Sequence, residues 1–167
     1  MARIDPAKLG QWFDEHAAQL VLYARQWRLG CAPEDLVQDV FLRLMAQPAE
    51  PGNVKAWLFR AVRNAAISAA RTDRRRAGRE LRVAEARPGW FQTNPGDLID
   101  AAAAQAALGE LPEAQREVVV LRVWGRMTLQ EVAETVGMPL SSVHEQYHAG
   151  LSALRKKMES SCRTKET

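Results

Sequence analysis

The side chains most able to bind another molecule are arginines, and they are concentrated in the middle of the chain. Residues 54–87 contain ten Lys and Arg against three acidic residues, so this segment carries a charge of +7. The first 53 residues and the last 80 each carry −2, and the whole chain carries +3. Because guanidinium groups bind phosphates well, such a concentration favours a nucleic-acid surface. A solvated helix face is the alternative.

A second pattern that can bind DNA lies in residues 128–157, which read TLQEVAETVGMPLSSVHEQYHAGLSALRKK. Ala133, Gly137 and Val143 have the spacing of a helix-turn-helix. In this motif a small residue lets the helices cross, glycine allows a positive φ in the turn, and a β-branched residue faces inward. A long helix is expected to follow. The second helix of such a motif enters the major groove of DNA, although a helical hairpin without a DNA role has the same pattern.

Residue types that serve in catalysis or metal binding are few. The histidines are His16, His144 and His148, and the two cysteines, Cys31 and Cys162, lack a spacing typical of ligands. His144 and His148 are four residues apart and could share a metal ion, but the sequence offers no third ligand. No glycine-rich phosphate loop or nucleophile arrangement accompanies them. We therefore expect no enzymatic activity, no cofactor and no metal, and reduced thiols in a cytoplasmic protein.

Apolar residues recur at helical spacing along most of the chain, which predicts an all-α fold of two small helical domains joined by a linker. The expected parts are a helical domain at 5–75, a linker at 76–97, a helix-turn-helix domain at 98–158 and a flexible tail at 159–167. In the linker, Trp90 and Phe91 are expected to pack on a neighbouring domain, with contact to a partner as the alternative. No apolar run reaches the length of a membrane span and the start lacks the apolar core of a signal peptide, so membrane insertion is not expected.

Three helices are expected in the first domain. The first covers residues 5–29 and ends at Gly30. The second begins at Pro33, a residue suited to the first turn of a helix. Its buried stripe consists of Leu36, Val40, Phe41 and Leu44. The third begins near Val54 and continues into the arginines.

Two helices are expected in the second domain before the helix-turn-helix, at 98–108 and 112–124. The latter is the more apolar of the two and carries Val118 and Val119. In the last helix, Tyr147 and Leu151 are expected to pack inward.

Three segments, in this order along the chain, resemble a bacterial sigma factor of the extracytoplasmic-function type. The first is APEDLVQDVFLRL (32–44), similar to the signature of the family's second conserved region. The second is VKAWLFRAVRNAAISAARTDRRR (54–76), similar to its promoter-melting part, and residues 111–158 are similar to the fourth region. The resemblance implies a protein that binds core RNA polymerase, recognises promoter DNA and helps to open the duplex. It adds an anti-sigma protein as a candidate partner.

The resemblance implies a polymerase-binding surface on the second helix. Asp35, Gln38 and Asp39 match the part of the family motif that docks on the coiled coil of the polymerase's largest subunit. Their spacing places them on one helical face, apart from the buried stripe, where carboxylates and an amide offer a polar patch for basic residues. A solvated helix face is the alternative.

The basic helix matches the family's strand-opening segment, where cations hold the backbone while unstacked bases are trapped. The candidate residues for this role and for the downstream promoter element are Arg60, Arg63, Asn64, Arg71, Arg74 and Arg75. The arginines are assigned chiefly to phosphates and Asn64 to a base or backbone hydrogen bond. Ser68 stands where the family often carries an acid, and Trp57 is expected in the core because of its apolar spacing.

The helix expected to read the upstream promoter element departs from the family. Its candidate residues are Ser141, Ser142, His144, Glu145, Gln146 and His148. Both serines are expected at the helix N-terminus, where a hydroxyl accepts a bond from an unpaired N–H. Family members usually carry Lys or Arg at several of these positions, whereas this helix has no permanent cation before Arg155. The alternative to a sigma factor is therefore a sigma-like protein-interaction module with weak or lost upstream reading. The same lack of charge argues against a free-standing repressor.

Overall fold

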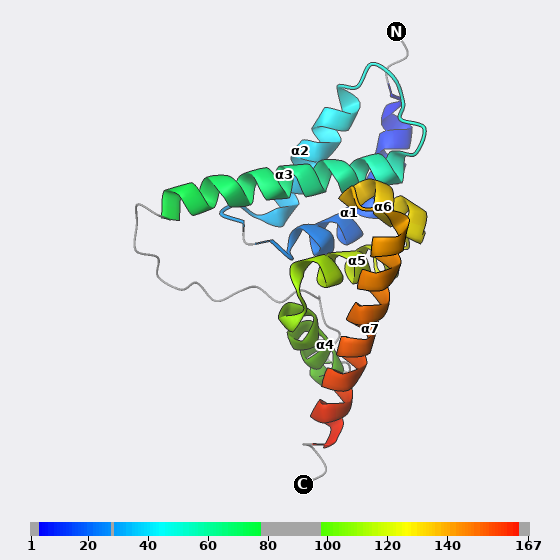
Figure 1. Ribbon diagram of the computed structural model, residues 1–167. Helices are drawn as coiled ribbons and strands as arrows, with labels where there is room; N and C mark the ends of the chain where they lie inside the picture. Colours follow the sequence, from blue (N-terminus) through cyan, green and yellow to red (C-terminus); the bar gives the residue numbers. More distant parts are fainter. Residues whose placement is uncertain (1–3, 28, 78–97, 164–167) are drawn as a thin grey trace. The chain divides into compact units, whose positions relative to one another are not determined.

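The computed structural model describes residues 4–27, 29–77 and 98–163, with backbone alone for 98–102 and 161–163 (Figure 1). Within these ranges every regular element is an α-helix, and the helices fall into two compact units. Unit 1 contains α1–α3 and unit 2 contains α4–α7. The predicted all-α fold of two helical domains is confirmed. Trp90 and Phe91 lie outside the described residues. None of the described helices is long and apolar enough to cross a membrane.

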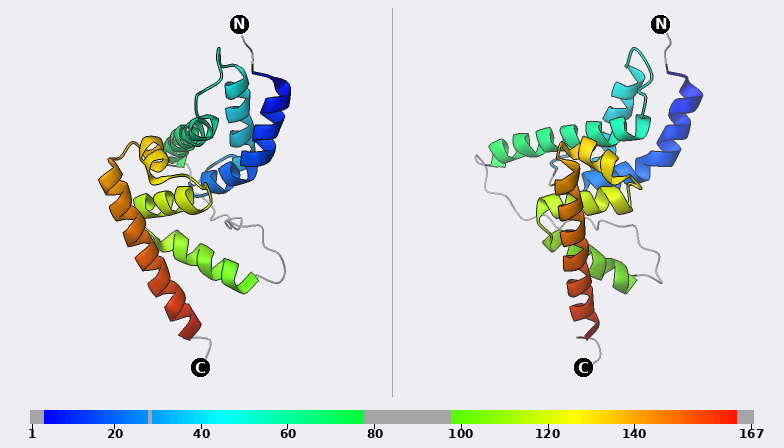
Figure 2. Two further views of the ribbon diagram at one scale, coloured as in Figure 1. Left: turned by 90° about the vertical axis from the view of Figure 1, so that its right-hand side faces the viewer. Right: turned by 45° about the vertical axis from the view of Figure 1, so that its right-hand side comes forward.

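Unit 1 is built from α1 (Pro6–Ala24), α2 (Pro33–Met45) and α3 (Val54–Ala77). Proline opens the first two helices, because its fixed φ suits a position where the backbone N–H would have no partner. Figures 1 and 2 show α1 and α2 beside each other and α3 crossing them. The predicted starts at Pro33 and Val54 are confirmed.

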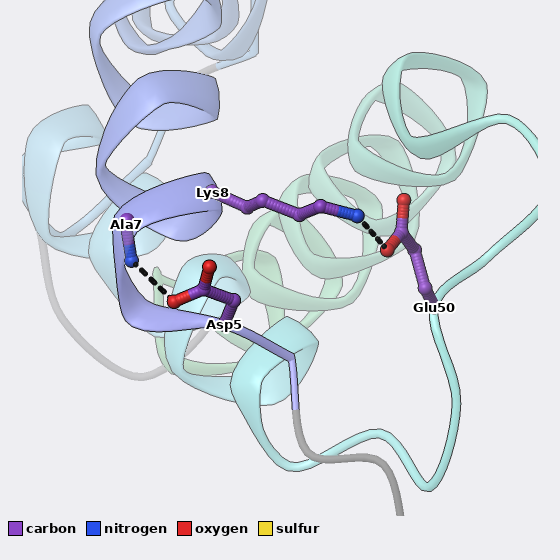
Figure 3. Close-up of polar contacts among 4 residues, drawn as sticks. All are labelled: Asp5, Ala7, Lys8 and Glu50. Carbon is purple, nitrogen blue, oxygen red and sulfur yellow. Dashed lines mark hydrogen bonds and ion pairs between the residues drawn. The ribbon is translucent and has the colours of Figure 1, made fainter.

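Side chains at the start of α1 fix how the chain enters this bundle (Figure 3). The Asp5 carboxylate accepts a hydrogen bond from the Ala7 backbone N–H at 3.1 Å and caps the helix. One turn later, Lys8 Nζ lies 2.9 Å from Glu50 Oε2 in the segment that precedes α3. Both ends of this ion pair are largely exposed, so it contributes little free energy.

The core of unit 1 centres on Tyr23, which is fully buried between two other aromatic rings. Its ring centroid lies 5.0 Å from that of Trp27 and 5.4 Å from that of Phe59, both in edge-on arrangements. The predicted stripe of α2 is buried. Its members are Leu36, Val40, Phe41 and Leu44, together with Val37.

The first helix is shorter than predicted. It ends at Ala24 rather than at residue 29, because the next amides bond three residues back instead of four: Gln26 N–H to the Tyr23 carbonyl, and Trp27 N–H to that of Ala24. This tighter turn brings Trp27 back into the core. Trp57 was predicted to be a core residue but is only half-buried.

Unit 2 is built from α4 (Leu98–Glu110), α5 (Glu113–Val123), α6 (Leu129–Val136) and α7 (Leu140–Arg163). The long helix α7 contacts all three others, and Figure 2 shows it running along the unit. Because α7 is continuous from Leu140 to Arg163, the long helix predicted to follow the helix-turn-helix is the second helix of the motif itself. It also extends to Arg163, into the segment predicted as a tail.

The helix-turn-helix forms as its spacing predicts. Gly137 has φ of 71° and closes α6, while Ala133 and Val143 are buried. Thr128 and Glu131 form a capping box at the start of α6, each side chain bonding the other residue's backbone N–H. The prediction for Leu151 was wrong, because its side chain is 37% exposed.

Candidate functional site

The basic face of α3 comprises the predicted strand-opening residues. The helix buries one side, including Leu58, Val62 and Ala66, against α1 and α2. Arg60, Asn64, Arg71, Arg74 and Arg75 are exposed, and Arg63 is half-buried at the edge. Spacings of four, seven and four residues place Arg60, Asn64, Arg71 and Arg75 in one stripe on the outer side. The structure thus brings four of the six candidates onto one face and sets Arg63 and Arg74 along its flank.

The arginines of the basic face are available for an external anion. Among the described residues, no carboxylate pairs with Arg60, Arg71, Arg74 or Arg75. The single acid of α3, Asp73, instead accepts a hydrogen bond from the Gly30 backbone N–H at 2.5 Å. Unpaired, exposed guanidinium groups at helical spacing bind phosphates without first breaking an internal ion pair.

The neighbouring thiol is not activated. Burial, with the charge of Asp73 as a second cause, raises the pKa of Cys31 above its ordinary value. A thiol with a raised pKa is protonated at neutral pH and is a poor nucleophile.

The polar face of α2 comprises Asp35, Gln38 and Asp39, all of which are exposed. They lie on the side of α2 opposite the buried stripe, as their spacing requires. The adjacent Glu34 is engaged within the unit, since Arg25 Nη2 lies 2.9 Å from its carboxylate. A backbone hydrogen bond, helped by Arg25, lowers the pKa of Glu34.

Two apolar residues extend the polar face of α2, and sequence reasoning missed them. Leu42 is 58% exposed and Met45 is 49% exposed. Leu42 stands three residues after Asp39 and Met45 three residues after Leu42, so they continue the same side of the helix. Their signal in the sequence was that both are large apolar residues outside the predicted stripe. A polar patch flanked by exposed aliphatic side chains suits a protein partner better than it suits water.

The upstream-element candidates occupy the first turns of α7. Ser141, His144, Glu145 and His148 are exposed, whereas Ser142 and Gln146 are half-buried. The predicted capping role of the serines is wrong, because α7 already begins at Leu140 and the Pro139 carbonyl accepts the Val143 N–H at 3.1 Å. Both serines therefore lie inside the first turn of α7, where Ser141 is exposed and Ser142 is half-buried.

The two histidines of α7 come together on its exposed face. Their ring centroids are 6.2 Å apart in a stacked arrangement, and the Tyr147 ring lies 5.7 Å from that of His148. In the part of the chain that the structure describes, no group of three or more His, Cys, Asp or Glu residues could hold a metal ion. The arrangement offers hydrogen-bonding and stacking groups to a ligand but little positive charge.

Two family models match this chain, each over the unit expected from its sequence. The model for Sigma-70 region 2 matches residues 12–76 and that for Sigma-70, region 4 matches residues 107–156. The first covers α2 and the basic face of α3, and the second covers the helix-turn-helix. The two matched ranges together span more than half of the chain.

Known proteins with similar sequences are sigma factors. ECF RNA polymerase sigma factor SigE of Mycolicibacterium smegmatis is 32% identical over 134 residues, covering 73% of this chain and 50% of SigE. ECF RNA polymerase sigma factor RpoE of Cereibacter sphaeroides is 27% identical over 135 residues, covering 77% of this chain and 70% of that relative. The chain therefore matches about half the length of SigE.

The fold agrees with these matches. A solved structure of the sigma factor RpoE in complex with the anti-sigma factor NepR from Bartonella quintana has a TM-score of 0.71 to this chain at 22% identity, covering 91% of this chain and 97% of that one. At this identity the likeness concerns the fold. Taken with the two region models in their order, the relatives show that the chain belongs to the sigma-70 family, in its extracytoplasmic-function (ECF) group.

Proposed function

We propose that this chain is a sigma factor that binds core RNA polymerase, directs it to promoters and helps to open the duplex, without catalysing a reaction itself. The observation that carries the proposal is the basic face of α3, whose exposed arginines lack carboxylate partners among the described residues. Such a face holds single-stranded DNA by its phosphates while bases unstack. Because the template and the polymerase are in the cytoplasm of a bacterium, the protein would act there.

The polymerase would bind the polar face of α2. Asp35, Gln38 and Asp39 would meet basic residues of the partner, and Leu42 and Met45 would lose water on contact. None of these five side chains contributes to the buried core of unit 1, so they can be changed without opening a cavity.

On the basic face, the arginines would hold the separated strand and Asn64 would bond to a base or to the backbone. Arg60, Arg71 and Arg75 share its central stripe and would act together, with Arg63 and Arg74 contacting the strand from the flank.

The test uses the pair of substitutions Asp35→Ala and Gln38→Ala in one full-length chain. We expect the wild type to co-purify with core RNA polymerase and to start transcripts at defined points. The double variant should bind core enzyme at least tenfold more weakly, since two interface contacts worth about 1 kcal/mol each are lost. The matched control is Asp14→Ala with Gln11→Ala, two exposed residues of α1. A wild-type chain that neither binds core enzyme nor starts transcripts would overturn the proposed function.

A second candidate function follows from the start of α7. The exposed residues among its candidates are two histidines, a serine and an acid, so neutralisation of DNA phosphates adds little to binding there. The chain could then be a sigma-like interaction module that keeps its polymerase-binding face but reads no upstream element. In the sigma-factor proposal, Ser141, Ser142, His144, Glu145, Gln146 and His148 would instead read base edges, with affinity supplied by the polymerase.

An anti-sigma protein is a further proposed partner. The structurally similar RpoE of Bartonella quintana was solved in complex with the anti-sigma factor NepR. The exposed aliphatic residues of α2 would be available to such a protein when polymerase is not bound.

A further inference from the structure

We propose that Asp73 is a positioning residue that holds the arginine-rich end of α3 in place for strand opening. The proposal rests on the proposed function of α3 and adds a residue that neither charge nor resemblance had singled out. Asp73 is the one acidic residue in the 24 of α3, and it stands between Arg71 and Arg74. An acid at this place in a phosphate-binding helix is unfavourable by charge alone, so it calls for another role.

The role follows from what the carboxylate contacts. Asp73 Oδ2 accepts the Gly30 backbone N–H at 2.5 Å, across 43 positions of sequence. Gly30 lies in the segment between α1 and α2, so the bond ties the last turns of α3 to the body of unit 1. Figure 1 shows this end of α3, in green, reaching past the other two helices. A hydrogen bond to an ionised acceptor is among the stronger protein contacts, and here it holds an otherwise projecting helix end.

Gly30 is suited to this contact by its lack of a side chain. A Cβ atom at residue 30 would lie 2.7 Å from Asp73 Oδ1, 2.9 Å from Oδ2 and 3.0 Å from Cγ. A side chain at residue 30 would therefore require the Asp73 carboxylate to shift. Glycine at residue 30 leaves room for this close approach to Asp73.

The bond also keeps the carboxylate away from the arginines. Asp73 is half-buried against the loop, while Arg71, Arg74 and Arg75 are exposed and have no carboxylate partner among the described residues. The helix thus keeps its acid engaged by the backbone and its guanidinium groups available for a strand.

Charge and position make opposite predictions, which allows a sharp test. If Asp73 acts only through its charge, then removing that charge beside phosphate-binding arginines strengthens DNA binding. If it positions the helix end, Asp73→Ala weakens strand opening, and Asp73→Asn preserves it because the amide oxygen can still accept the Gly30 N–H.

The experiment uses holoenzyme assembled from the full-length chain and core RNA polymerase, on a promoter mapped with the wild type. The readout is permanganate reactivity of unpaired thymines. We expect Asp73→Ala and Gly30→Ala each to lower the open fraction about tenfold, and Asp73→Asn to change it by less than about twofold. Open complexes of Asp73→Ala at or above the wild-type level, or equal losses in Asp73→Ala and Asp73→Asn, would overturn the inference.

Two further measurements separate this outcome from misfolding and from failure of the proposed function. The Gly30 amide should be protected from hydrogen exchange in the wild type and in Asp73→Asn, and lose that protection in Asp73→Ala. Co-purification with core enzyme should stay unchanged in all three variants, because the polar face of α2 is untouched. If the wild type opens no promoter, the proposed function fails. If the Gly30 amide of the wild type is not protected from exchange, the hydrogen bond to Asp73 does not form in solution and the inference about Asp73 fails by itself.

Discussion

Single residues in this chain show how burial changes chemistry that the sequence alone leaves open. His16 is half-buried in α1, and its Nδ1 atom is buried with no hydrogen-bond partner among the described residues. Burial lowers the pKa of His16, with Glu15 opposing the shift and Lys55 adding to it. Its Nε2 lies 3.8 Å from Glu15, yet the lowered pKa means that this contact does not compensate for desolvation. Folding therefore favours the neutral form of His16.

A pH dependence of stability follows from His16. Because its folded pKa is lowered, the unfolded chain takes up a proton more readily than the folded one. The contribution of His16 to the free energy of unfolding is then fully present above the ordinary histidine pKa of about 6.5. It is lost as pH falls through the lowered pKa of the folded state. His16→Gln should flatten the decline between about pH 7 and pH 5. Amide hydrogen exchange in α1, followed as a function of pH, measures this decline. The same pH dependence in the wild type and in His16→Gln would rule the mechanism out.

Whole elements are positioned by small residues at crossing points. A Cβ atom at Gly150 of α7 would lie 2.8 Å from Val119 Cγ2 and 3.4 Å from the Gln115 carbonyl oxygen of α5. Val119 is buried and β-branched, so it has little freedom to move aside. The packing of α7 against α5 therefore depends on glycine where the two helices cross. In the same unit, Lys157 pairs with Glu110 and links α7 to the end of α4.

Replacing glycine tests this crossing, with a matched control in the same unit. We expect Gly150→Ala to lower the free energy of unfolding of unit 2 by about 1 kcal/mol or more through overpacking. Gly109 is also helical, but no other atom lies within 4 Å of the position that its Cβ atom would take. Gly109→Ala should therefore raise the free energy of unfolding by about 0.5 kcal/mol, because alanine has the higher helix propensity. Urea unfolding of the full chain measures both. Equal effects of the two substitutions would show that the close approach at Gly150 has no energetic consequence.

Across the whole molecule, charge is divided between the units. The segment at 54–87 carries +7, whereas the last 80 residues carry −2. The basic face of α3 is thus suited to sequence-independent phosphate contacts, and the start of α7, which has no Lys or Arg, to base contacts or to none. In the proposed sigma factor, both units would act on one promoter, and different helices would supply affinity and sequence preference.

This division predicts different responses in the two units. Arg71→Ala should reduce the slope of log binding constant against log salt concentration by about 1, for holoenzyme on promoter DNA. Gln146→Ala should leave that slope unchanged and alter the upstream sequence shared by promoters selected from a random library. If the selected promoters share no upstream sequence and Gln146→Ala has no effect, the interaction-module function is favoured.

The amino-acid sequence alone determined the features that depend on near neighbours along the chain. Helical periodicity, Pro33 at a helix start and the spacing of Ala133, Gly137 and Val143 need only local geometry, and all appear in the structure. The family also followed from sequence, because its motifs are contiguous. The roles of individual site residues remain predictions for the experiments above.

Only the tertiary structure decided which helix faces are covered and which distant residues meet. Leu42, Met45 and Leu151 are apolar yet exposed, since exposure depends on whether a neighbouring helix lies over them. The contacts of Gly30 with Asp73 and of Gly150 with Val119 join positions far apart in sequence, where no periodicity operates. Local rules predict where a helix forms, but the approach of two backbones or side chains depends on the packing of every element between them.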